Sequence, residues 1–539
     1  MTFQITFLPE GRGWRGDSAT PLSIAASACD IVIEQPCGAR ASCGRCRVRF
    51  ADGAPAPDEA DARVLGGPAV ADGWRLGCRV RLTGDASVEV PWQARVVAHK
   101  SFGGDDLFAD GVGPDPAAGW GVAVDAGSTT IAAAVVALDT GAVHGSASLL
   151  NPQTAFGPDV MSRIAFARLH PTGALALRRA LVAGVGEVVT RAAAAAGVDV
   201  ADVTQLAVVG NPTMLHALRG LPLDGLGVAP FQGADYEAWE GDAWALGLAL
   251  PAARVLLLPA IRAHVGADTV AGILATGLDR SAGPRLLLDL GTNTELVLAW
   301  AGGILCTSAA AGPAFEGANI RSGMRAVPGA IEQVRIAAGG SLQLHTIGDE
   351  PALGICGSGL VDAVAELLRT GVIEPSGRMR PATELAGEAV ARHVVEVDGE
   401  RAVLLADGAP RPVLLTARDV RELQLVKGSI ASAVTLLLAE AGLAVSDLEE
   451  VLLAGAFGNY VGLGSALSLG LLPPVPPDRV RFAGNAAGAG ARLALVDRRA
   501  RERAVRVARE ARFVELAGRP DYQEAFVAML AFPEPQATS

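Results

Sequence analysis

The sequence predicts a small α+β domain followed by a larger α/β domain that consists of two lobes. Three observations support this division. Three cysteines lie close together near the start of the chain, a strand–aspartate–glycine segment occurs twice after about residue 119, and a stretch rich in Gly, Pro and Asp separates these features. A repeated segment of this kind predicts two related halves that share one ligand.

Four segments follow from these features. The expected boundaries are 1–92 for the first domain, 93–118 for a flexible linker, 119–283 for the first lobe and 284–539 for the second lobe. The linker contains SFGGDDLFADGVGPDPAAG, and its Gly, Pro and Asp content is typical of an irregular tether. The sequence therefore predicts that the first domain moves relative to the two lobes.

The composition indicates a globular chain with a core of small aliphatic residues. Half of the 539 residues are hydrophobic but only 4% are aromatic, and the net charge is −12. An acidic chain argues against nucleic acid as a partner. No apolar run approaches the roughly 20 residues of a membrane helix, and the start MTFQITFLPEGRGWRG lacks the apolar segment of a signal peptide. We therefore expect a soluble cytoplasmic protein with no membrane partner.

The seven cysteines indicate a metal site rather than a disulfide framework, because the number is odd and most of them lie early in a long chain. Cys37, Cys43 and Cys46 are spaced C-x5-C-x2-C, and Cys78 follows in LGCRVRL. A tight loop of three cysteines plus one distant cysteine is the ligand pattern of a [2Fe–2S] ferredoxin. Four thiolates surround the two irons, and small loop residues leave backbone N–H groups available to the sulfurs.

The spacing of the cysteines leaves two points open. The loop is one residue longer than the plant-type C-x4-C-x2-C, as in the adrenodoxin-type ferredoxins, so the potential of the plant type does not transfer. Zinc is the alternative metal, although structural zinc sites usually bring two close cysteine pairs and only Cys43 and Cys46 form one here. Cys29, Cys306 and Cys356 are expected to be packing residues.

The segment Leu286–Trp300, LLLDLGTNTELVLAW, predicts a strand, a small polar loop and a second strand. Asp289 lies at the end of the first strand, where a carboxylate can orient a metal ion or a water. Gly291, Thr292 and Asn293 form the loop. Glycine lets the backbone approach an anion closely, and N–H and hydroxyl groups can bind phosphate oxygens. An ordinary hairpin is the alternative for this copy taken alone.

An earlier segment, Gly121–Leu138, repeats this pattern as GVAVDAGSTTIAAAVVAL. Asp125 aligns with Asp289. The loop residues of the earlier copy are Gly127, Ser128, Thr129 and Thr130. Two such hairpins, each with an aspartate and phosphate-binding donors, predict a nucleotide clamped between two lobes.

Two glycine-rich turns in the second lobe are further candidates. Gly455–Gly458 follows an apolar strand, and a weaker copy of this strand and turn occurs at Gln205–Leu218. Gly357 and Ser358 lie in GICGSGLVDAVAELLRTG, where a glycine-rich turn opens an amphipathic helix. A helix N-terminus with a glycine loop is suited to anion binding. A simple tight turn is the alternative.

Three other features each allow two interpretations. His216 lies at helical spacing among apolar residues, which indicates a core or rim histidine more than a ligand. Asp268 either faces the nucleotide cleft or begins a helix, since aspartate is a good N-cap. Residues 492–512 contain eight arginines on a helical stretch, which is either a solvated face or a surface for an acidic partner.

The paired Asp-x-Gly-[Ser/Thr]-type loops and the glycine-rich turn resemble those of the actin, sugar kinase and Hsp70 superfamily of ATPases. Four further segments resemble the reductive activators of corrinoid proteins: NPQTAFGPDVMSRI at 151–164, VGNPTMLHALRGL at 209–221, AAGPAFEGANIRSGMRA at 310–326 and LLAGAFGNY at 452–460. With the N-terminal cysteines, the resemblance covers nearly the whole chain. It implies a ferredoxin-like β-grasp domain and a two-lobed actin-like ATPase domain.

The resemblance also implies roles for the candidate residues. Asp125 and Asp289 would face one Mg–ATP from opposite lobes, with the Mg²⁺ held through waters because this ion dehydrates reluctantly. Glu316 would approach the nucleotide or its water, and Gly455–Gly458 would lie against the adenosine. The four N-terminal cysteines would hold the [2Fe–2S] cluster.

The function implied is ATP-dependent reductive activation, in which one electron from the cluster converts Co(II) to Co(I) in a corrinoid protein of a methyltransferase system. An upstream electron donor is then a second partner. Two alternatives remain open from the motifs alone. One is a small-molecule kinase with an accessory redox domain, and the other is a redox sensor that binds nucleotide without catalysis.

Overall fold

The computed structural model describes residues 3–8, 11–16, 20–27, 29, 31, 33, 41, 44, 46–91, 119–291, 293–407, 411–458 and 461–534. The expected linker, 93–118, lies outside these residues. The described chain divides into two compact units between Leu257 and Leu258. Residues 3–91 and 119–257 belong to the first unit, and residues 258–534 belong to the second.

The N-terminal residues form a mixed five-stranded sheet in the order β2-β1-β7-β4-β5. β1 pairs antiparallel with β2 and parallel with β7. Phe3, Ile5 and Phe7 alternate along β1 and are buried, as the two-residue period of a strand requires. The elements are β1 (Phe3–Leu8), β2 (Arg12–Gly16), β3 (Thr20–Pro21), α1 (Leu22–Ser27), β4 (Arg47–Asp52), α2 (Glu59–Leu65), α3 (Gly67–Ala71), β5 (Trp74–Leu76), β6 (Arg81–Leu82) and β7 (Ala86–Glu89). This is the expected ferredoxin-like α+β domain.

The rest of the first unit is built on a six-stranded sheet in the order β10-β9-β8-β11-β13-β12. Its strands are β8 (Trp120–Ala126), β9 (Thr130–Ala137), β10 (Val143–Leu150), β11 (Val203–Val209), β12 (Trp239–Asp242) and β13 (Arg254–Leu257). Its helices are α4 (Val160–Leu169), α5 (Gly173–Ala196) and α6 (Pro212–Arg219). A Cβ atom at Gly145 would lie 2.4 Å from the Ala196 nitrogen, so glycine lets α5 pack tightly on β10.

The second unit contains a matching six-stranded sheet in the order β24-β23-β14-β15-β16-β25. Its strands are β14 (Arg285–Leu290), β15 (Thr294–Trp300), β16 (Gly303–Ala309), β23 (Glu450–Ala454), β24 (Val480–Gly484) and β25 (Arg512–Phe513). β14 pairs antiparallel with β15 and parallel with β23, as β8 pairs antiparallel with β9 and parallel with β11. The internal repeat expected from the sequence is therefore present in the strand pairing.

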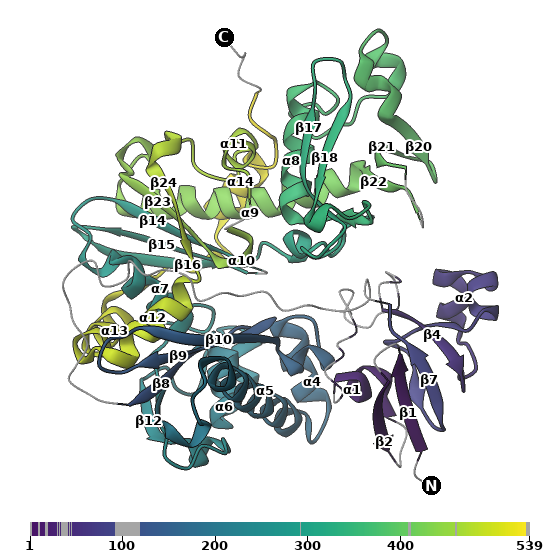
Figure 1. Cartoon of the computed structure of the whole chain (residues 1–539). Helices are drawn as coiled ribbons and strands as arrows, with labels where there is room; N and C mark the ends of the chain where they lie inside the picture. The colour runs from purple at the N-terminus through teal and green to yellow at the C-terminus, as the bar shows by residue number, and fades with distance from the viewer. Residues whose placement is uncertain are drawn as a thin grey trace. The chain divides into compact units, whose positions relative to one another are not determined.

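Helices cover both faces of the second sheet (Figure 1). The helices of this part of the unit are α7 (Ala267–Thr276), α9 (Ala417–Ala441), α10 (Gly455–Gly458), α11 (Leu463–Ser468), α12 (Ala486–Val496), α13 (Arg498–Glu510) and α14 (Pro520–Ala528). Of these, α14 packs on α9, and α13 packs on α7 and α12. Leu286, Leu288 and Leu296 share one buried core with α9, whereas Leu287 on the other face contacts Gly272 of α7. The structure groups α7 with the second sheet, although the sequence places it before the expected boundary at 283.

The crossing of α7 and α12 depends on small residues. A Cβ at Gly490 would lie 2.0 Å from the Ala271 carbonyl oxygen, so the two helix backbones are nearly in contact. This packing explains the Gly- and Ala-rich sequence of α12. Among the described helices, α9 has the length and apolar composition of a membrane span, but 72% of its apolar window is buried in the fold.

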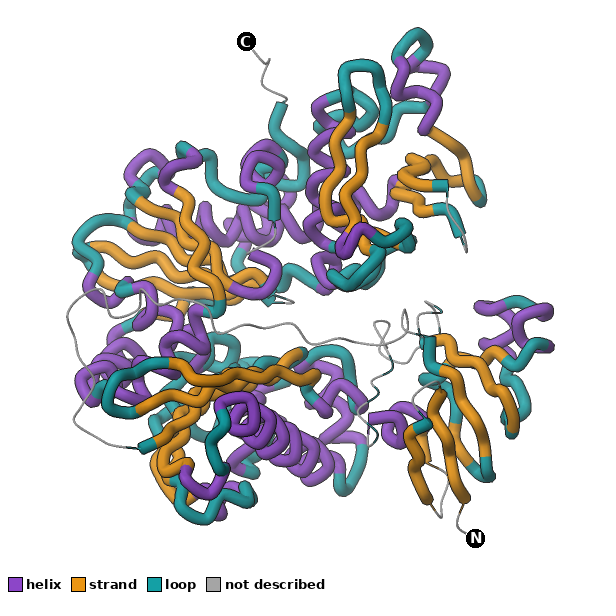
Figure 2. Tube along the Cα trace, in the orientation of Figure 1, coloured by secondary structure: helices purple, strands orange, loops and turns teal. Residues whose placement is uncertain are grey.

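Two smaller sheets and α8 (Gly357–Arg369) extend the second unit, and Figure 2 shows their strands apart from the main sheet. The strands are β17 (Ala330–Ile336), β18 (Leu342–Thr346), β19 (Gly354–Ile355), β20 (Val394–Val397), β21 (Glu400–Ala406) and β22 (Val413–Thr416). Side chains of α8 bond to the backbone of β17: Glu366 accepts from the Ile336 N–H at 2.7 Å and Arg369 donates to the Ile336 carbonyl at 2.7 Å.

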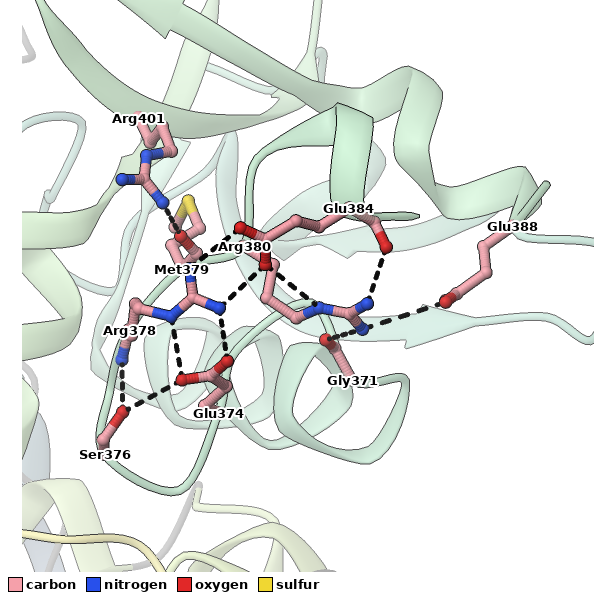
Figure 3. A network of polar contacts seen from close by, with 9 residues as sticks. All are labelled: Gly371, Glu374, Ser376, Arg378, Met379, Arg380, Glu384, Glu388 and Arg401. Atoms are coloured by element: carbon pink, nitrogen blue, oxygen red, sulfur yellow. Dashed lines mark hydrogen bonds and ion pairs between the residues drawn. The ribbon is translucent and has the colours of Figure 1, made fainter. Parts of the chain in front are cut away.

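An arginine–glutamate network holds the turn that follows α8 (Figure 3). Arg378 bridges Glu374 and Glu384, with N–O distances of 2.5 and 2.7 Å. Arg380 donates to the Gly371 carbonyl at 3.0 Å. Because these side chains are partly exposed, each pair contributes little stability, and the network chiefly fixes the path of the turn.

The other side of this turn is fastened to α9 and to the segment after α14. The Gln424 side chain donates to the carbonyls of Ser376 and Leu530, both at 3.0 Å. Lys427, which is buried, donates to the carbonyls of Met529 and Ala531 at 2.7 and 2.6 Å. We call this group, Gln424 and Lys427 with residues 529–532, the α9 clasp.

His216 is a buried structural residue of α6, as its apolar neighbours in the sequence indicate. Its Nε2 accepts from the Ala234 N–H at 3.0 Å, which places the ring proton on Nδ1, 2.8 Å from the Pro212 carbonyl. Burial lowers the pKa of His216. The neutral ring therefore fastens the loop at 233–236 to α6.

Candidate functional site

Two of the four expected cluster ligands lie in the described chain, and the fold brings their loops together. Cys46 is buried directly before β4, and Cys78 is partly exposed after β5. The N–H of Gly77 donates to the Cys46 carbonyl at 2.8 Å, and a Cβ at Gly77 would lie 2.7 Å from that oxygen. Cys37 and Cys43 lie outside the described residues.

Two described residues before Cys46 have left-handed backbone conformations. Ala41 has a φ of 55° and Gly44 a φ of 68°. Cys29, in contrast, belongs to the apolar core of the domain, as the sequence predicts. The hydrogen bond between Gly77 and Cys46 therefore brings the chain at Cys78 next to Cys46, as two ligands of one cluster require.

The first phosphate-loop candidate is hydrogen-bonded through its backbone to the Asn151 side chain. Asp125 is buried at the end of β8, and Gly127, Ser128 and Thr129 form the following turn, with Thr130 opening β9. The Asn151 side chain donates to the Gly127 carbonyl at 2.9 Å. Asn151 was not among the expected site residues, although it begins the NPQ segment that carries part of the family resemblance.

The second phosphate-loop candidate contacts the expected adenosine-side turn. Asp289 lies near the end of β14, followed by Gly291 and the exposed Asn293, while Thr292 lies outside the described residues. Gly455 has a φ of 87°, and a Cβ there would lie 2.6 Å from the Asp289 Oδ1 atom. Only glycine allows the turn Gly455–Gly458 to approach this carboxylate so closely.

The start of α8 joins the same site through two stacked aromatic rings. Phe315 and Phe457 lie parallel, with ring centroids 3.9 Å apart. A Cβ at Gly357 would lie 2.3 Å from the Phe315 carbonyl and 2.9 Å from the Phe457 ring. The three glycine-bearing segments of the second unit that the sequence singles out, at Asp289, Gly357 and Gly455, are therefore brought together.

The N-cap residue of α8, Cys356, makes no side-chain hydrogen bond to the backbone N–H groups of the first turn. Ser358 is buried, and its hydroxyl lies 3.3 Å from the Cys356 sulfur. Burial raises the pKa of Cys356, so the thiol stays protonated and acts as a packing residue. Glu316 ends the short helix η8 (Pro313–Glu316), next to the stacked Phe315.

A cross-strand row of polar side chains was not anticipated from the sequence. Asp289 on β14 pairs with Glu295 on β15, and Glu295 pairs with Ser308 on β16. Directly paired residues project from the same face of a sheet. Ser308 donates to Glu295 Oε1 at 3.2 Å. Asp268, in the first turn of α7, interacts electrostatically with the same Glu295 carboxyl group.

The pKa of Glu295 is raised well above its ordinary value, first by burial and then by the negative charges of Asp268 and Asp289. The sequence did contain a signal for this pairing. In a hairpin whose loop is residues 291–293, Leu290 pairs with Thr294, and Asp289 therefore pairs with Glu295. Asp125 belongs to the first unit, so its approach to the same nucleotide stays a prediction.

Three family models match the chain in succession. Residues 10–83 match the 2Fe-2S iron-sulfur cluster binding domain, residues 120–281 match the RACo middle region, and residues 284–539 match the C-terminal domain of RACo, the ASKHA domain. The first match supports a [2Fe–2S] cluster in the N-terminal domain, and the last supports nucleotide binding.

Two enzymes and one solved structure are similar to this chain. The corrinoid activation enzyme RamQ of Eubacterium limosum is 35% identical over 419 residues, 76% of this chain and 69% of that protein. The [Co(II) methylated amine-specific corrinoid protein] reductase of Methanosarcina barkeri is 28% identical over 353 residues, 58% of this chain and 59% of that protein. A solved structure of a reductive activator for a corrinoid, iron-sulfur protein superposes with a TM-score of 0.69 at 26% identity, covering 99% of this chain and 98% of that one.

Proposed function

The chain belongs to the family of RACo-type reductive activators, and from that membership we propose that it reduces a corrinoid protein from Co(II) to Co(I) in an ATP-dependent reaction. The observation that carries this proposal is the likeness to the corrinoid activation enzyme over 76% of the chain. The family models add that one polypeptide matches both a 2Fe-2S cluster binding domain and an ASKHA domain.

Cys37, Cys43, Cys46 and Cys78 are the proposed ligands of the cluster. The contact between Gly77 and Cys46 supports this assignment, because it sets the loop of Cys78 beside that of Cys46. When bound, the cluster supplies one electron at a time. The chain would provide the four thiolates, and backbone N–H groups near the sulfurs would tune the potential.

The proposed nucleotide is Mg–ATP, oriented by Asp125 from the first lobe and Asp289 from the second. Mg²⁺ is proposed to keep its waters between the ion and these carboxylates. The phosphate-binding residues are proposed as Gly127, Ser128, Thr129, Thr130, Gly291, Thr292, Asn293, Gly357 and Ser358. Gly455 and Gly458 are proposed to line the adenosine, and Glu316 to orient the attacking water.

The energetic case for ATP rests on the difficulty of the Co(II)/Co(I) step. For a one-electron transfer, each 59 mV uphill costs about 1.4 kcal/mol. Binding the corrinoid in a form that lacks its axial ligand raises the acceptor potential and offsets this cost. ATP is proposed to stabilise that complex, since a ligand shifts an equilibrium only by its different affinity for the two states.

The partners are proposed to be the corrinoid protein of a methyltransferase system and an upstream electron donor, in the cytoplasm and without a membrane. A small-molecule kinase and a nucleotide-binding redox sensor are the competing functions. Neither predicts that cobalt reduction depends on ATP.

The deciding experiment uses anaerobic protein with a chemically reduced cluster, mixed with a corrinoid protein and followed by visible spectroscopy with and without Mg–ATP. We expect the Co(I) spectrum to appear with ATP and to be lost in Cys46→Ser. Cys29→Ser is the matched control and keeps activity, because Cys29 lies in the apolar core. ATP-independent or absent Co(I) formation contradicts the proposal.

A further inference from the structure

The turn that carries Cys78 is fixed at both of its ends and in its middle. It spans residues 76–79, and its last N–H donates to its first carbonyl at 2.8 Å. A hydrogen bond of this kind defines the direction of the two inner residues, Gly77 and Cys78. The Gly77 N–H joins the turn to Cys46, and the first and last residues of the turn are joined to the start of α2.

Asp61 joins the first residue of the turn to α2. It is only 3% exposed, and its Oδ1 accepts from the Leu76 N–H at 2.8 Å. Its Oδ2 accepts from the Asp58 N–H at 3.0 Å. Because Leu76 is fully buried, its N–H would lack a hydrogen bond without Asp61, in a place that water does not reach. The backbone two residues before Cys78 therefore depends on this carboxylate.

Asp58 joins the last residue of the turn to the same helix. Its Oδ1 accepts from the Asp61 N–H at 3.0 Å, and Arg79 Nε donates to its Oδ2 at 2.9 Å. A capping box uses one side-chain oxygen of each residue to bond the backbone N–H of the other. In α2, the second oxygen of each carboxylate bonds to the turn of Cys78. The box therefore fixes both the start of the helix and this turn.

Arg79 brings positive charge next to the proposed ligand. It follows Cys78 directly in the chain, and the two side chains interact electrostatically. Reduction gives the cluster one more negative charge, and the charge around the sulfurs helps to set the potential. Arg79 therefore favours the reduced form, and Asp58 offsets part of its charge. The side chains are 51% and 37% exposed, so water screens the effect and keeps it modest.

We propose that Asp58 and Asp61 are positioning residues of the cluster site. Asp61 fixes the backbone that leads to Cys78, and Asp58 sets the position of Arg79 and the charge that acts on the thiolate. The start of α2 thereby controls both the retention of the cluster and its midpoint potential. This inference rests on the proposed function only in taking Cys78 as a ligand of a [2Fe–2S] cluster.

A redox titration of the anaerobic full-length protein tests the role of charge. Arg79→Gln removes the positive charge, and we expect the midpoint potential to fall. Asp58→Asn leaves Arg79 uncompensated, and we expect the potential to rise, while the asparagine carbonyl still accepts from the Asp61 N–H. At a fixed applied potential, each variant should change the ratio of reduced to oxidised cluster about threefold, in opposite directions. The double variant should return close to the parent, because both charges are then absent.

Arg49→Gln is the matched control for the loss of charge. Arg49 lies on β4 of the same domain, and its Nη2 is also 2.9 Å from a partly exposed aspartate, Asp72. It is three residues beyond Cys46, about 10 Å of extended chain, so we expect an unchanged potential. The inference is wrong if Asp58→Asn and Arg79→Gln move the potential in the same direction, or if Arg49→Gln moves it as far as Arg79→Gln.

A second measurement, the loss of visible cluster absorbance after addition of an iron chelator, tests Asp61. Asp61→Ala leaves the Leu76 N–H without its acceptor, so the cluster should be lost at least about fivefold faster than in the parent. Glu59→Ala, the matched control, removes an exposed carboxylate from the same helical turn and should keep the parent rate. Equal rates for the two variants would contradict the role of Asp61. If Asp61→Ala does not fold, the potentials of Asp58→Asn and Arg79→Gln decide the inference.

The outcomes separate the inference from the proposed function. If the two potentials shift as expected but no Co(I) forms with a corrinoid protein and Mg–ATP, the proposed function fails and the inference stands. If Co(I) forms with ATP but the potentials of Asp58→Asn and Arg79→Gln equal that of the parent, the inference fails and the proposed function stands.

Discussion

At the scale of single residues, the missing side chain of Gly455 sets the distance between the adenosine-side turn and Asp289. Gly455→Ala would place a methyl group 2.6 Å from the carboxylate and in a left-handed backbone conformation. We expect a loss of about 1–3 kcal/mol in unfolding free energy and at least tenfold weaker ATP binding, measured by denaturation and calorimetry.

Gly464 provides the control for that substitution. It lies in α11, nearby in sequence, and a Cβ there would meet no heavy atom within 4 Å. Gly464→Ala is expected to leave ATP binding unchanged and to stabilise the helix slightly. Equal ATP affinity in both variants would show that ATP binding does not depend on the close approach of Gly455 to Asp289.

Lys427 gives a prediction for pH at the same scale. Burial lowers the pKa of this lysine to about 8 from an ordinary 10.5. Between these values the unfolded chain binds the proton more tightly than the folded chain, so the contribution of Lys427 to stability rises with pH from about 8 to 10.5. The unfolding free energy of the parent should gain up to about 3 kcal/mol relative to Lys427→Met over this range, measured by urea denaturation. A constant difference between the two proteins would contradict it.

At the scale of elements, α13 has an acidic N-cap, Asp497, followed by a first turn that is positively charged. Its first turn carries Arg498, Arg499 and Arg501 and no acidic residue. Positive charge at a helix N-terminus is unfavourable, so Arg499→Glu should raise stability by about 0.5 kcal/mol in thermal unfolding. If the arginines form a surface for an acidic partner, the same variant weakens corrinoid activation at low salt, whereas a solvated face leaves activation unchanged.

Arg506→Glu is the matched control on the same helix. Arg506 is exposed and lies four residues from both Glu502 and Glu510, so glutamate there adds like-charge repulsion without a dipole benefit. We expect this variant to be less stable than the parent. A similar effect of both substitutions would mean that the helix dipole does not govern α13.

The sequence predicts those elements whose pattern of residues lies within one short stretch of the chain. The β14–β15 hairpin follows from apolar runs around Gly291, and the N-terminal sheet domain follows from the cysteine spacing. The position of Glu295 beside Asp289 was missed because it depends on strand register, which pairs the two residues. The contacts of Lys427 were missed because its acceptors lie about a hundred residues later in the chain.

At the scale of the whole molecule, the cluster ligands and the phosphate loops occupy separate stretches of sequence. The four cysteines precede residue 92 and every phosphate-loop candidate follows residue 119. We therefore expect Mg–ATP alone to shift the cluster's midpoint potential by less than about 60 mV, or 1.4 kcal/mol for one electron. Redox titration with and without Mg–ATP, in the absence of a partner, measures this shift. A larger one would mean that ATP acts on the cluster itself.

The α9 clasp bears on how the chain is synthesised. Lys427 and its carbonyl acceptor at Met529 are 102 residues apart. When α9 leaves the ribosome, its lysine has no acceptors yet, and the surface that residues 529–532 later cover is open to water. Folding from the N-terminus onward can complete the first unit early. The second unit is completed only after nearly all of the remaining translation, and during that interval we expect the exposed surface of α9 to bind chaperones.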